Sequence, residues 1–113
     1  MTKIEAIIRP TMLDTVKAAL DELGLHGITV SHVVGSGKQR GRTQHYRGQE
    51  YTINLLDKIK IETVVPDESV KAVMNAIADA AGTGEIGDGK IFVYKIDDAM
   101  RIRTKEAGET AIR

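Results

Sequence analysis

The sequence contains no cysteine and no tryptophan, and only one phenylalanine and two prolines occur among its 113 residues. The absence of cysteine excludes disulfides, thiolate metal sites and a cysteine nucleophile. Because large aromatic residues are scarce, the core must be built from aliphatic side chains. Lysine plus arginine equals aspartate plus glutamate, 16 of each, so the chain has no net basic charge to hold a polyanion such as DNA.

Long apolar runs are also missing. The opening stretch MTKIEAIIRP has too short an apolar run for a signal peptide, and no later stretch is long enough to span a bilayer. We therefore expect a cytoplasmic protein. A composition of 42% hydrophobic and 28% charged residues is typical of one ordinary globular domain, here residues 1–113.

Hydrophobic periodicity predicts the order strand, helix, strand twice over. Alternating or β-branched apolar residues predict four strands, over 3–9, 28–37, 57–65 and 90–96. Apolar residues three and four apart predict one helix after the strand at 3–9 and another after the strand at 57–65. Thr11 and Asp14 resemble a capping box at the start of the first helix, and the second helix ends at Gly82. The stretch 101–104 is a candidate for a short fifth strand.

This order predicts an α+β fold of the ferredoxin-like βαββαβ type, in which a four-stranded antiparallel sheet carries both helices on one face. The other face is then uncovered, and it carries Ile7, Val64 and Phe92. A face with exposed large apolar residues requires a cover. In so small a chain we expect that cover to be another copy of the chain itself.

The glycine-rich stretch AGTGEIGDGK, residues 81–90, matches two phosphate-binding patterns, GxGxxG and GxxxxGK. Both patterns need a strand before the glycines and a helix after them, whereas this stretch follows a predicted helix and precedes a predicted strand. It is therefore neither a dinucleotide-binding turn nor a P-loop. Four glycines in eight positions, interleaved with Asp88 and Lys90, exceed what a turn requires and favour phosphate binding over a simple turn.

About twenty residues without periodicity, 37–56, connect the second and third strands, and connections of this length are usually functional or disordered. Their polar composition predicts that the segment projects and moves. Tyrosine and arginine are enriched at binding hot spots, so we favour a partner-binding loop over a solvated hairpin extension. Elsewhere, Arg101 and Arg103 would share one face of an extended chain and would suit phosphate oxygens.

The motifs YRGQEY (46–51) and TGEIGDGKIFVY (83–94), with the opening KIEAIIRP and the segment MRIRTKE, resemble those of the PII nitrogen-regulatory signal-transduction proteins. The resemblance spans essentially the whole chain. It implies a homotrimer of ferredoxin-like protomers that binds ATP or ADP in the clefts between subunits. It also implies 2-oxoglutarate bound beside MgATP, and a long flexible loop that inserts into partner proteins.

The resemblance also implies roles for individual residues. The nucleotide site would comprise Ile7, Thr29, Gly35, Gly37, Lys38, Gln39, Glu62, Val64, Gly87, Asp88, Gly89, Lys90, Arg101 and Arg103. Gln39 would complete the coordination of Mg²⁺, and Gln39, Lys58 and Gly87 would hold 2-oxoglutarate. Arg47 would plug the pore of an ammonium transporter, and Tyr51 matches the tyrosine that is nucleotidylated in some bacterial members.

The sequence departs from the family pattern at several positions. Lys38 stands where arginine is usual, which keeps the charge but loses bidentate geometry. Gln49 stands where alanine or serine is usual, which excludes a serine-phosphorylation switch there. Glu85 stands where lysine is common, so the charge beside the phosphates would be reversed.

The implied function is that of a non-enzymatic sensor of nitrogen, carbon and energy status. ATP and ADP would compete, 2-oxoglutarate would bind only with MgATP, and the ligand state would select a loop conformation. The loop would then bind or release a target, such as an ammonium transporter or an enzyme or regulator of nitrogen metabolism. Binding to a transporter would bring the protein reversibly to the inner face of the membrane.

Two other functions are compatible with the same fold. A small ATP-hydrolysing or acyl-phosphate-hydrolysing enzyme is one, but the sequence shows neither a GxxG loop with an arginine near the N-terminus nor an evident nucleophile or base. An RNA-binding module is the other, and it needs exposed aromatic residues on its strands and a basic face. Phe92 and Tyr94 are expected on opposite faces, and the net charge is zero, so we expect no nucleic-acid partner.

Overall fold

The computed structural model describes residues 1–36, 42–46, 49–53 and 55–113, and of residues 42–46 and 49–53 it describes the backbone alone. Short 3-10 helices at Pro10–Met12 and Asp67–Ser69 precede the two α-helices, and a third closes the chain at Gly108–Ile112. The remaining elements are β1 (Thr2–Ile8), α1 (Leu13–Glu22), β2 (Thr29–Gly35), β3 (Arg42–Tyr46), β4 (Gln49–Ile53), β5 (Leu56–Val65), α2 (Val70–Ala81) and β6 (Gly89–Lys95).

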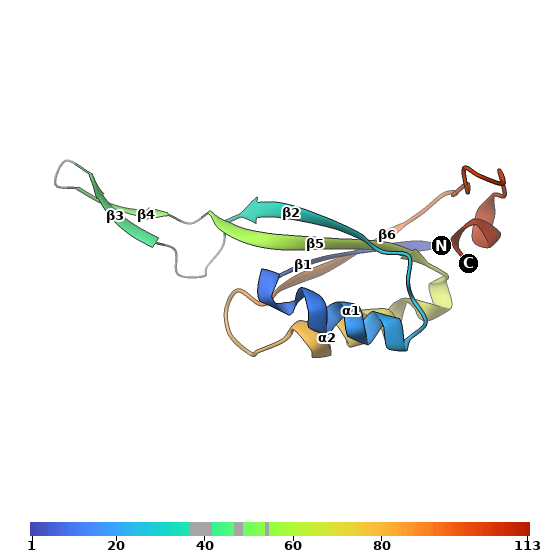
Figure 1. Cartoon of the computed structure of the whole chain (residues 1–113), viewed down its shortest axis with the longest axis horizontal. Coiled ribbons are helices and arrows are strands. Elements are labelled where there is room, and N and C mark those ends of the chain that lie inside the picture. The colour runs from blue at the N-terminus through green and yellow to red at the C-terminus, as the bar shows by residue number, and fades with distance from the viewer. Residues whose placement is uncertain (37–41, 47–48, 54) are drawn as a thin grey trace.

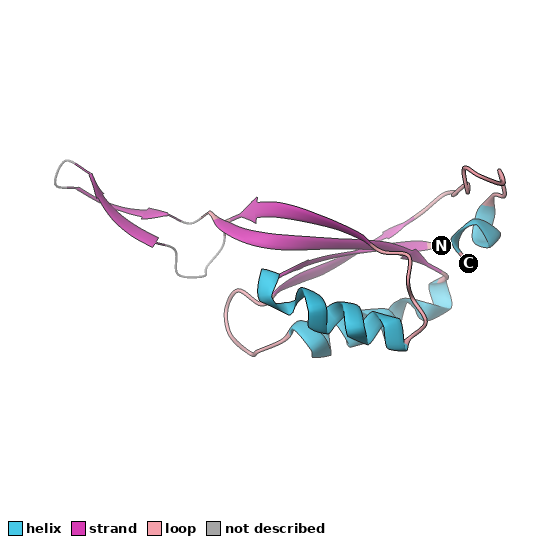
Figure 2. Ribbon diagram, viewed as in Figure 1, coloured by secondary structure: helices cyan, strands magenta, loops and turns pink. Residues whose placement is uncertain are grey.

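Four strands form one antiparallel sheet in the order β2-β5-β1-β6. Helices α1 and α2 lie side by side on one face of this sheet (Figures 1 and 2). This is the ferredoxin-like arrangement, so the predicted fold class is confirmed. Among the described residues no helix is long and apolar enough to cross a membrane.

The core lies between the sheet and the two helices, and strand alternation decides which residues enter it. Ile4, Ala6 and Ile8 of β1 are buried there, with exposed fractions of 2% or less. The other buried hydrophobic residues are Val16, Leu20, Ile59, Ile61, Val65, Val73, Ile77 and Ala81. Each fully buried isoleucine or leucine contributes about 1.5–3 kcal/mol relative to exposure. The core is aliphatic throughout, as the scarcity of aromatic residues requires.

The opposite face of the sheet, here called the open face, carries no described helix. It presents the predicted Ile7, Val64 and Phe92 and, between them, charged residues of β1 and β5. Phe92 and Tyr94 of β6 pair with Glu5 and Lys3 of β1, and the two aromatic residues are 46% and 47% exposed. Residues two apart on a strand point the same way, so the expectation that these two aromatics face opposite sides is wrong.

The long connection contains regular structure that its sequence did not predict. β3 and β4 pair antiparallel from Arg42↔Ile53 to Tyr46↔Gln49 and form a separate two-stranded sheet. In Figure 1 this ribbon lies beyond the ends of β2 and β5, away from the helices. The segment 37–56 therefore includes two strands, and Leu56 already belongs to β5.

Two smaller predictions are wrong. Residues 102–104 form a turn instead of a fifth strand, and only an isolated bridge, Met100↔Ala107, lies beside it. No capping box forms at Thr11, because this residue lies inside the 3-10 helix that Pro10 begins, and the N-cap of α1 is Met12 without a side-chain hydrogen bond.

Candidate functional site

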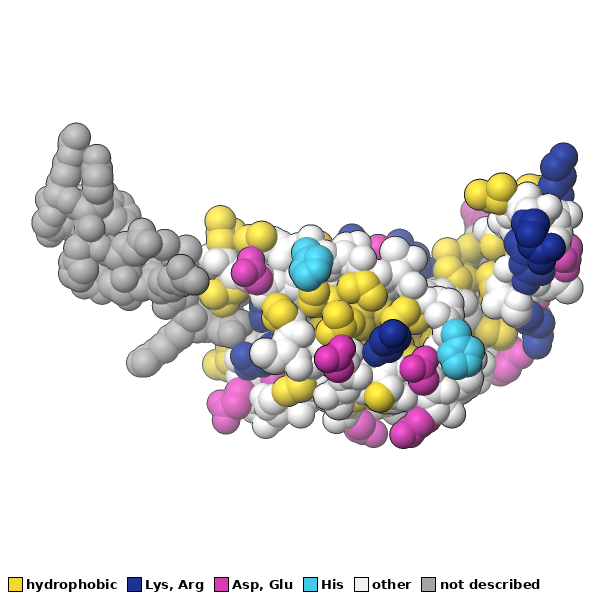
Figure 3. Space-filling view, viewed as in Figure 1, with side chains coloured by type: hydrophobic (Ala, Val, Ile, Leu, Met, Phe, Trp, Pro, Cys, Tyr) yellow, Lys and Arg dark blue, Asp and Glu magenta, His cyan; other side chains and the backbone are white. Residues whose placement is uncertain are grey.

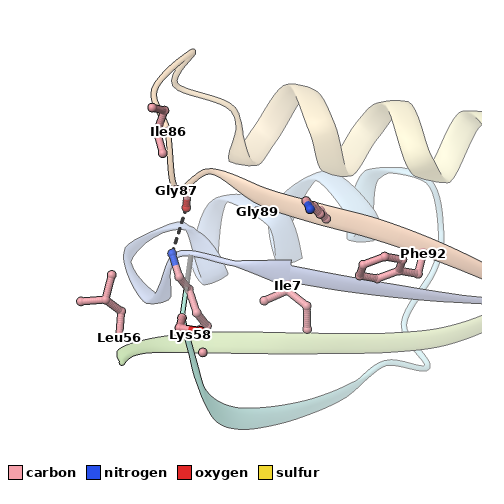
Figure 4. Close-up of a pocket in the computed structure, with 10 residues that line it drawn as sticks. Ile7, Leu56, Lys58, Ile86, Gly87, Gly89 and Phe92 are labelled. Carbon is pink, nitrogen blue, oxygen red and sulfur yellow. Dashed lines mark hydrogen bonds between the residues drawn. The ribbon is translucent and has the colours of Figure 1, made fainter. Parts of the chain in front are cut away.

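A pocket of ≈ 630 Å³ opens on the open face where β1 ends and β6 begins (Figure 4). This volume lies within the range of small-molecule sites. Its lining residues are Ile7, Gly35, Ser36, Leu56, Lys58, Ile86, Gly87, Gly89, Lys90 and Phe92. The structure thus brings together six residues predicted for ligand binding, namely Ile7, Gly35, Lys58, Gly87, Gly89 and Lys90.

The glycines of the 82–89 loop have structural causes of their own. Gly84, Gly87 and Gly89 have φ angles of +86°, +103° and +113°, which side chains adopt only at a cost. At Gly89 a Cβ atom would also lie 1.7 Å from the carbonyl oxygen of Ile7. The prediction that the glycines exceed what a turn requires is therefore wrong, although the loop still lines the pocket.

Asp88 stabilises this loop through hydrogen bonds to other residues of the loop. Its carboxylate accepts hydrogen bonds from the amides of Thr83 and Gly84 at 2.7 and 2.9 Å and from the Thr83 hydroxyl at 2.5 Å. The hydroxyl contact is the main cause that lowers the pKa of Asp88 to about 2. Because these two amides already bind a carboxylate, they are not available to a phosphate in this conformation. The described role of Asp88 is structural, and its predicted nucleotide contact stays a prediction.

Lys58 reaches from β5 across the pocket mouth to the loop. Its Nζ atom donates to the carbonyl oxygen of Gly87 at 3.0 Å, as the dashed line in Figure 4 shows. Burial lowers the pKa of Lys58, the Arg9 guanidinium lowers it further, and Asp88 opposes both. An anion bound beside this ammonium group would offset the unfavourable burial of its charge.

The pocket therefore combines cationic and apolar walls. Lys58 and Lys90 supply two ammonium groups, while Ile7, Ile86 and Phe92 supply apolar surface. Such a lining suits a ligand that has both an anionic part and an apolar or aromatic part. No group of three histidine or acidic side chains is placed to hold a metal ion among the residues that the structure describes.

Three other predicted residues lie at the opposite end of the open face. Thr29 pairs with Glu62 where β2 begins, and Val64 pairs with Lys3 where β1 begins. Lys58 and Val64 are six residues apart on β5, a distance of about 20 Å along the strand. We call this the far end of the open face, and the pocket with the 82–89 loop the loop end.

Glu62 is held in a charged network at the far end. Its carboxylate forms an ion pair with Lys3 at 2.8 Å and a longer one with Lys60 at 3.6 Å. The hydrogen bond from Lys3 is the main cause that lowers the pKa of Glu62. Beside this pair, Tyr94 donates its hydroxyl proton to Glu5 at 2.6 Å.

Arg101 and Arg103 lie beyond the far end, in the C-terminal segment that Figure 1 colours red. They belong to a turn instead of the extended stretch that the sequence suggested. The guanidinium of Arg101 contacts Glu106 Oε1 at 3.1 Å and the carbonyl oxygens of Thr110 and Arg113 at 3.1 and 2.7 Å. Within one protomer, neither arginine lines the pocket.

Some predicted site residues cannot be placed. Gly37, Lys38, Gln39 and Arg47 lie outside the described residues, and of Tyr51 only the backbone, in β4, is described. Their predicted roles stay predictions.

Sequence reasoning missed Arg9. This residue directly follows β1 and donates to the carbonyl oxygen of Ile86 at 2.8 Å and to Asp88 at 3.4 Å. These hydrogen bonds therefore hold the 82–89 loop against the end of β1, directly before the 3-10 helix at Pro10–Met12. The only signal of Arg9 in the sequence is a charge beside Pro10 at a strand end, which is too common to indicate a site.

Comparison with known proteins agrees with this architecture. The family model of "Nitrogen regulatory protein P-II" matches residues 1–106. The chain is 57% identical over 112 residues to the Nitrogen regulatory protein P-II of Rhodospirillum rubrum, and 55% identical to that of Rhizobium meliloti. It is 52% identical to the protein of the same name from Haemophilus influenzae. Each comparison covers 99% of this chain and 100% of the relative.

These relatives bear the name of regulators, which supports a signalling role in nitrogen regulation over the hydrolase considered as an alternative. The family resemblance of the two sequence motifs is thereby confirmed. The chain belongs to the nitrogen regulatory protein P-II family, whose members are signal transducers and not enzymes.

Proposed function

We propose that this protein is a homotrimeric sensor of nitrogen, carbon and energy status that binds ATP or ADP between protomers and 2-oxoglutarate beside MgATP. The observation that carries this proposal is the division of the predicted nucleotide residues between the two ends of the open face. The loop end holds Lys90 and the glycines, and the far end holds Thr29, Glu62 and Val64. A neighbouring copy that places its far end against the loop end would join the two groups in one site.

The shape of the open face supports such an assembly. Ile7, Val64 and Phe92 present apolar surface there, and exposed apolar patches of this kind mark interaction sites. A contact between two different ends of the same face is heterologous, and heterologous contacts form a closed ring when the rotation between copies is a whole fraction of a full turn. A three-membered ring would contain three equivalent sites and would also bring Arg101 and Arg103 of each copy to the pocket of the next.

The chemistry of the pocket supports anionic ligands. Lys90, with Arg101 and Arg103 from the neighbouring copy, would bind the phosphates, and Lys58 would bind one carboxylate of 2-oxoglutarate. Mg²⁺ would arrive with ATP, and Gln39 would complete its coordination. The metal would then supply a positive charge for the second carboxylate, which is why we expect 2-oxoglutarate to bind only after MgATP.

The segment 37–56, with Arg47 and Tyr51, would transmit the ligand state to a target. We propose an ammonium transporter as one target, and enzymes or regulators of nitrogen metabolism as others. Tyr51 is the proposed site of any covalent modification. The protein would act in the cytoplasm and would bind reversibly at the inner face of the membrane through the transporter.

Calorimetry on the isolated protein tests the nucleotide site. Charge-assisted contacts are worth about 1.5–3 kcal/mol, so Lys90→Ala should weaken ATP and ADP binding about 10- to 100-fold. Lys71→Ala, which removes an exposed lysine on α2, is the matched control and should leave both affinities unchanged. Equal affinities in the Lys90→Ala variant and the control would remove Lys90 from the site.

The ordered binding of the effector needs a separate experiment. We expect 2-oxoglutarate to give heat only when MgATP is present, and Lys58→Met to abolish that heat. Binding of 2-oxoglutarate to the nucleotide-free protein would contradict the ordered mechanism.

A pull-down on transporter-containing membranes tests the partner. We expect retention with ADP and release when 2-oxoglutarate is titrated at fixed MgATP. Retention that ignores both 2-oxoglutarate and the Arg47→Ala change would refute the assignment of an ammonium transporter.

A further inference from the structure

Lys105 has an unusual backbone conformation. Its φ angle is +61°, and no other residue except glycine has a positive φ in the described part of the chain. The conformation is imposed by a tight turn, in which the Lys105 amide donates to the Arg101 carbonyl at 2.7 Å and the Arg101 amide donates to the Glu106 carbonyl at 2.9 Å. Glycine would satisfy this geometry without the cost that a side chain adds there.

Residues held in unfavourable backbone conformations cluster at functional sites, so Lys105 is a candidate functional residue. The side chain of Lys105 is exposed and forms no described hydrogen bond or ion pair that would offset the backbone cost. Packing does not explain its presence either, because the residue stands outside the core. The property that lysine adds to this turn is its positive charge.

The cationic side chains of the C-terminal segment differ in whether they already have hydrogen-bond or ion-pair partners. Both terminal nitrogens of Arg101 already bind Glu106 and two backbone carbonyls, and Arg113 pairs with Glu109 at 3.3 Å. Arg103 and Lys105 have no acidic partner among the residues that the structure describes. Figure 3 shows lysine and arginine side chains gathered at this end of the molecule.

Arg103 and Lys105 can act on the same group. They are two residues apart in one turn, so their Cα atoms lie within about 7 Å of each other. A guanidinium and an ammonium at this spacing can bind different oxygens of one polyphosphate chain, the first through its fork of N–H groups and the second as a compact point charge.

We propose that Lys105 is a specificity-determining residue of the nucleotide site, where it joins Arg103 on the polyphosphate of the nucleotide held by the neighbouring copy's pocket and favours ATP over ADP. The proposal rests on the nucleotide site proposed above. ATP carries more negative charge than ADP. An added cation near the terminal phosphate therefore strengthens the binding of ATP more than that of ADP.

Three substitutions separate the charge of Lys105 from its backbone conformation. Lys105→Asn removes the charge but keeps a residue that tolerates the left-handed conformation. Lys105→Gly removes both the charge and the strain, and Lys105→Arg keeps the charge. Lys71→Gln changes the net charge equally on the exposed side of α2 and is the matched control.

Calorimetric titration of the full-length protein with ATP and with ADP is the test. We expect ATP affinity to fall about three- to tenfold in Lys105→Asn and Lys105→Gly, the size typical of partly exposed charge contacts. ADP affinity should fall less, and Lys105→Arg should retain the wild-type preference. Lys105→Gly should also melt at a higher temperature than the wild type, so its loss of ATP affinity could not be caused by instability.

The outcomes distinguish this proposal from the proposed function. If the wild-type protein binds ATP and the Lys105→Asn and Lys105→Gly variants bind it as the Lys71→Gln control does, the role of Lys105 is overturned while the nucleotide site stands. A wild-type protein that binds neither nucleotide would overturn both. Equal losses for ATP and ADP would overturn the assignment of Lys105 to ATP preference.

Discussion

Replacing Gly89 by alanine tests the junction on which the whole pocket depends. Gly89 begins β6 and pairs with Ile8 of β1. An added Cβ atom would lie 1.7 Å from the Ile7 carbonyl oxygen and 2.8 Å from its carbonyl carbon. Both neighbours are backbone atoms, so the new atom can be accommodated only if β1 and β6 move apart.

The size of the effect follows from this geometry. Non-bonded heavy atoms in contact prefer separations near 3.5–4.0 Å, so the strands would have to separate by roughly 2 Å to relieve the 1.7 Å approach. Two ladder hydrogen bonds would be lost at about 1 kcal/mol each. The backbone conformation at φ +113° would add about 1–3 kcal/mol for a residue with a side chain. We therefore expect Gly89→Ala to lower the free energy of unfolding by about 3–5 kcal/mol.

Gly84→Ala in the same loop is the control. Its φ of +86° is also positive, but a Cβ atom there would meet nothing within 4 Å. Only the backbone term of about 1–2 kcal/mol should remain. Urea unfolding followed by circular dichroism measures both variants, at one protomer concentration because assembly affects apparent stability. Equal losses of stability in the two variants would refute the close approach of Gly89 to β1.

Two further predictions concern acid stability and assembly. The pKa of Asp88 is about 2, below its ordinary value of 3.8. The ionised Asp88 carboxylate therefore contributes its full stabilisation above pH 3.8, and this stabilisation is lost as the pH falls from 3.8 towards 2. Asp88→Asn should thus destabilise the protein at neutral pH and reduce the pH dependence of unfolding in this acidic window, whereas an unchanged dependence would contradict the role of Asp88 in the loop. Phe92→Asp places a charge on the open face, so this variant should be monomeric by light scattering at micromolar concentration. The control Leu23→Asp changes a residue of similar exposure, 49% against 46% for Phe92, and should leave the trimer intact. An intact Phe92→Asp trimer would show that another surface assembles the copies.

The strand and helix order could be predicted from the sequence because it depends on local periodicity. Ile4, Ala6 and Ile8 alternate with polar neighbours, and this alternation fixes both the buried and the open face of β1. The same reasoning places Phe92 and Tyr94 on one face, and the expectation of opposite faces ignored it.

The turn at 102–104 and the strands β3 and β4 could not be predicted from periodicity in the same way. The stretch 101–104 alternates like a strand, but a strand needs a partner, and here Arg101 pairs with Glu106 across a turn instead. β3 and β4 have the sequences RTQHY and QEYTI, in which polar residues outnumber apolar ones. Their pairing leaves no periodic signal of burial.

The pocket could be predicted only in part. The sequence indicated that Gly87, Gly89 and Lys90 form a ligand-binding loop, but it could not show that Asp88 binds the amides of the same loop. That contact depends on positive φ angles at neighbouring glycines, which composition does not reveal. The contribution of Arg9 depends on the distance between β1 and a loop about eighty residues later, which only the folded chain defines.

The central claim is that two neighbouring copies complete each nucleotide site, and subunit mixing tests it most directly. Lys90→Ala disables the loop end, and the double variant Arg101→Ala with Arg103→Ala disables the C-terminal contribution. Each homotrimer alone should bind ATP weakly. When the two variants are unfolded together and refolded as a 1:1 mixture, about one quarter of the interfaces in a cyclic trimer should combine two intact ends. Calorimetry should then recover wild-type affinity at about that fraction of the sites, whereas a mixture without any high-affinity sites would show that each site lies within one protomer.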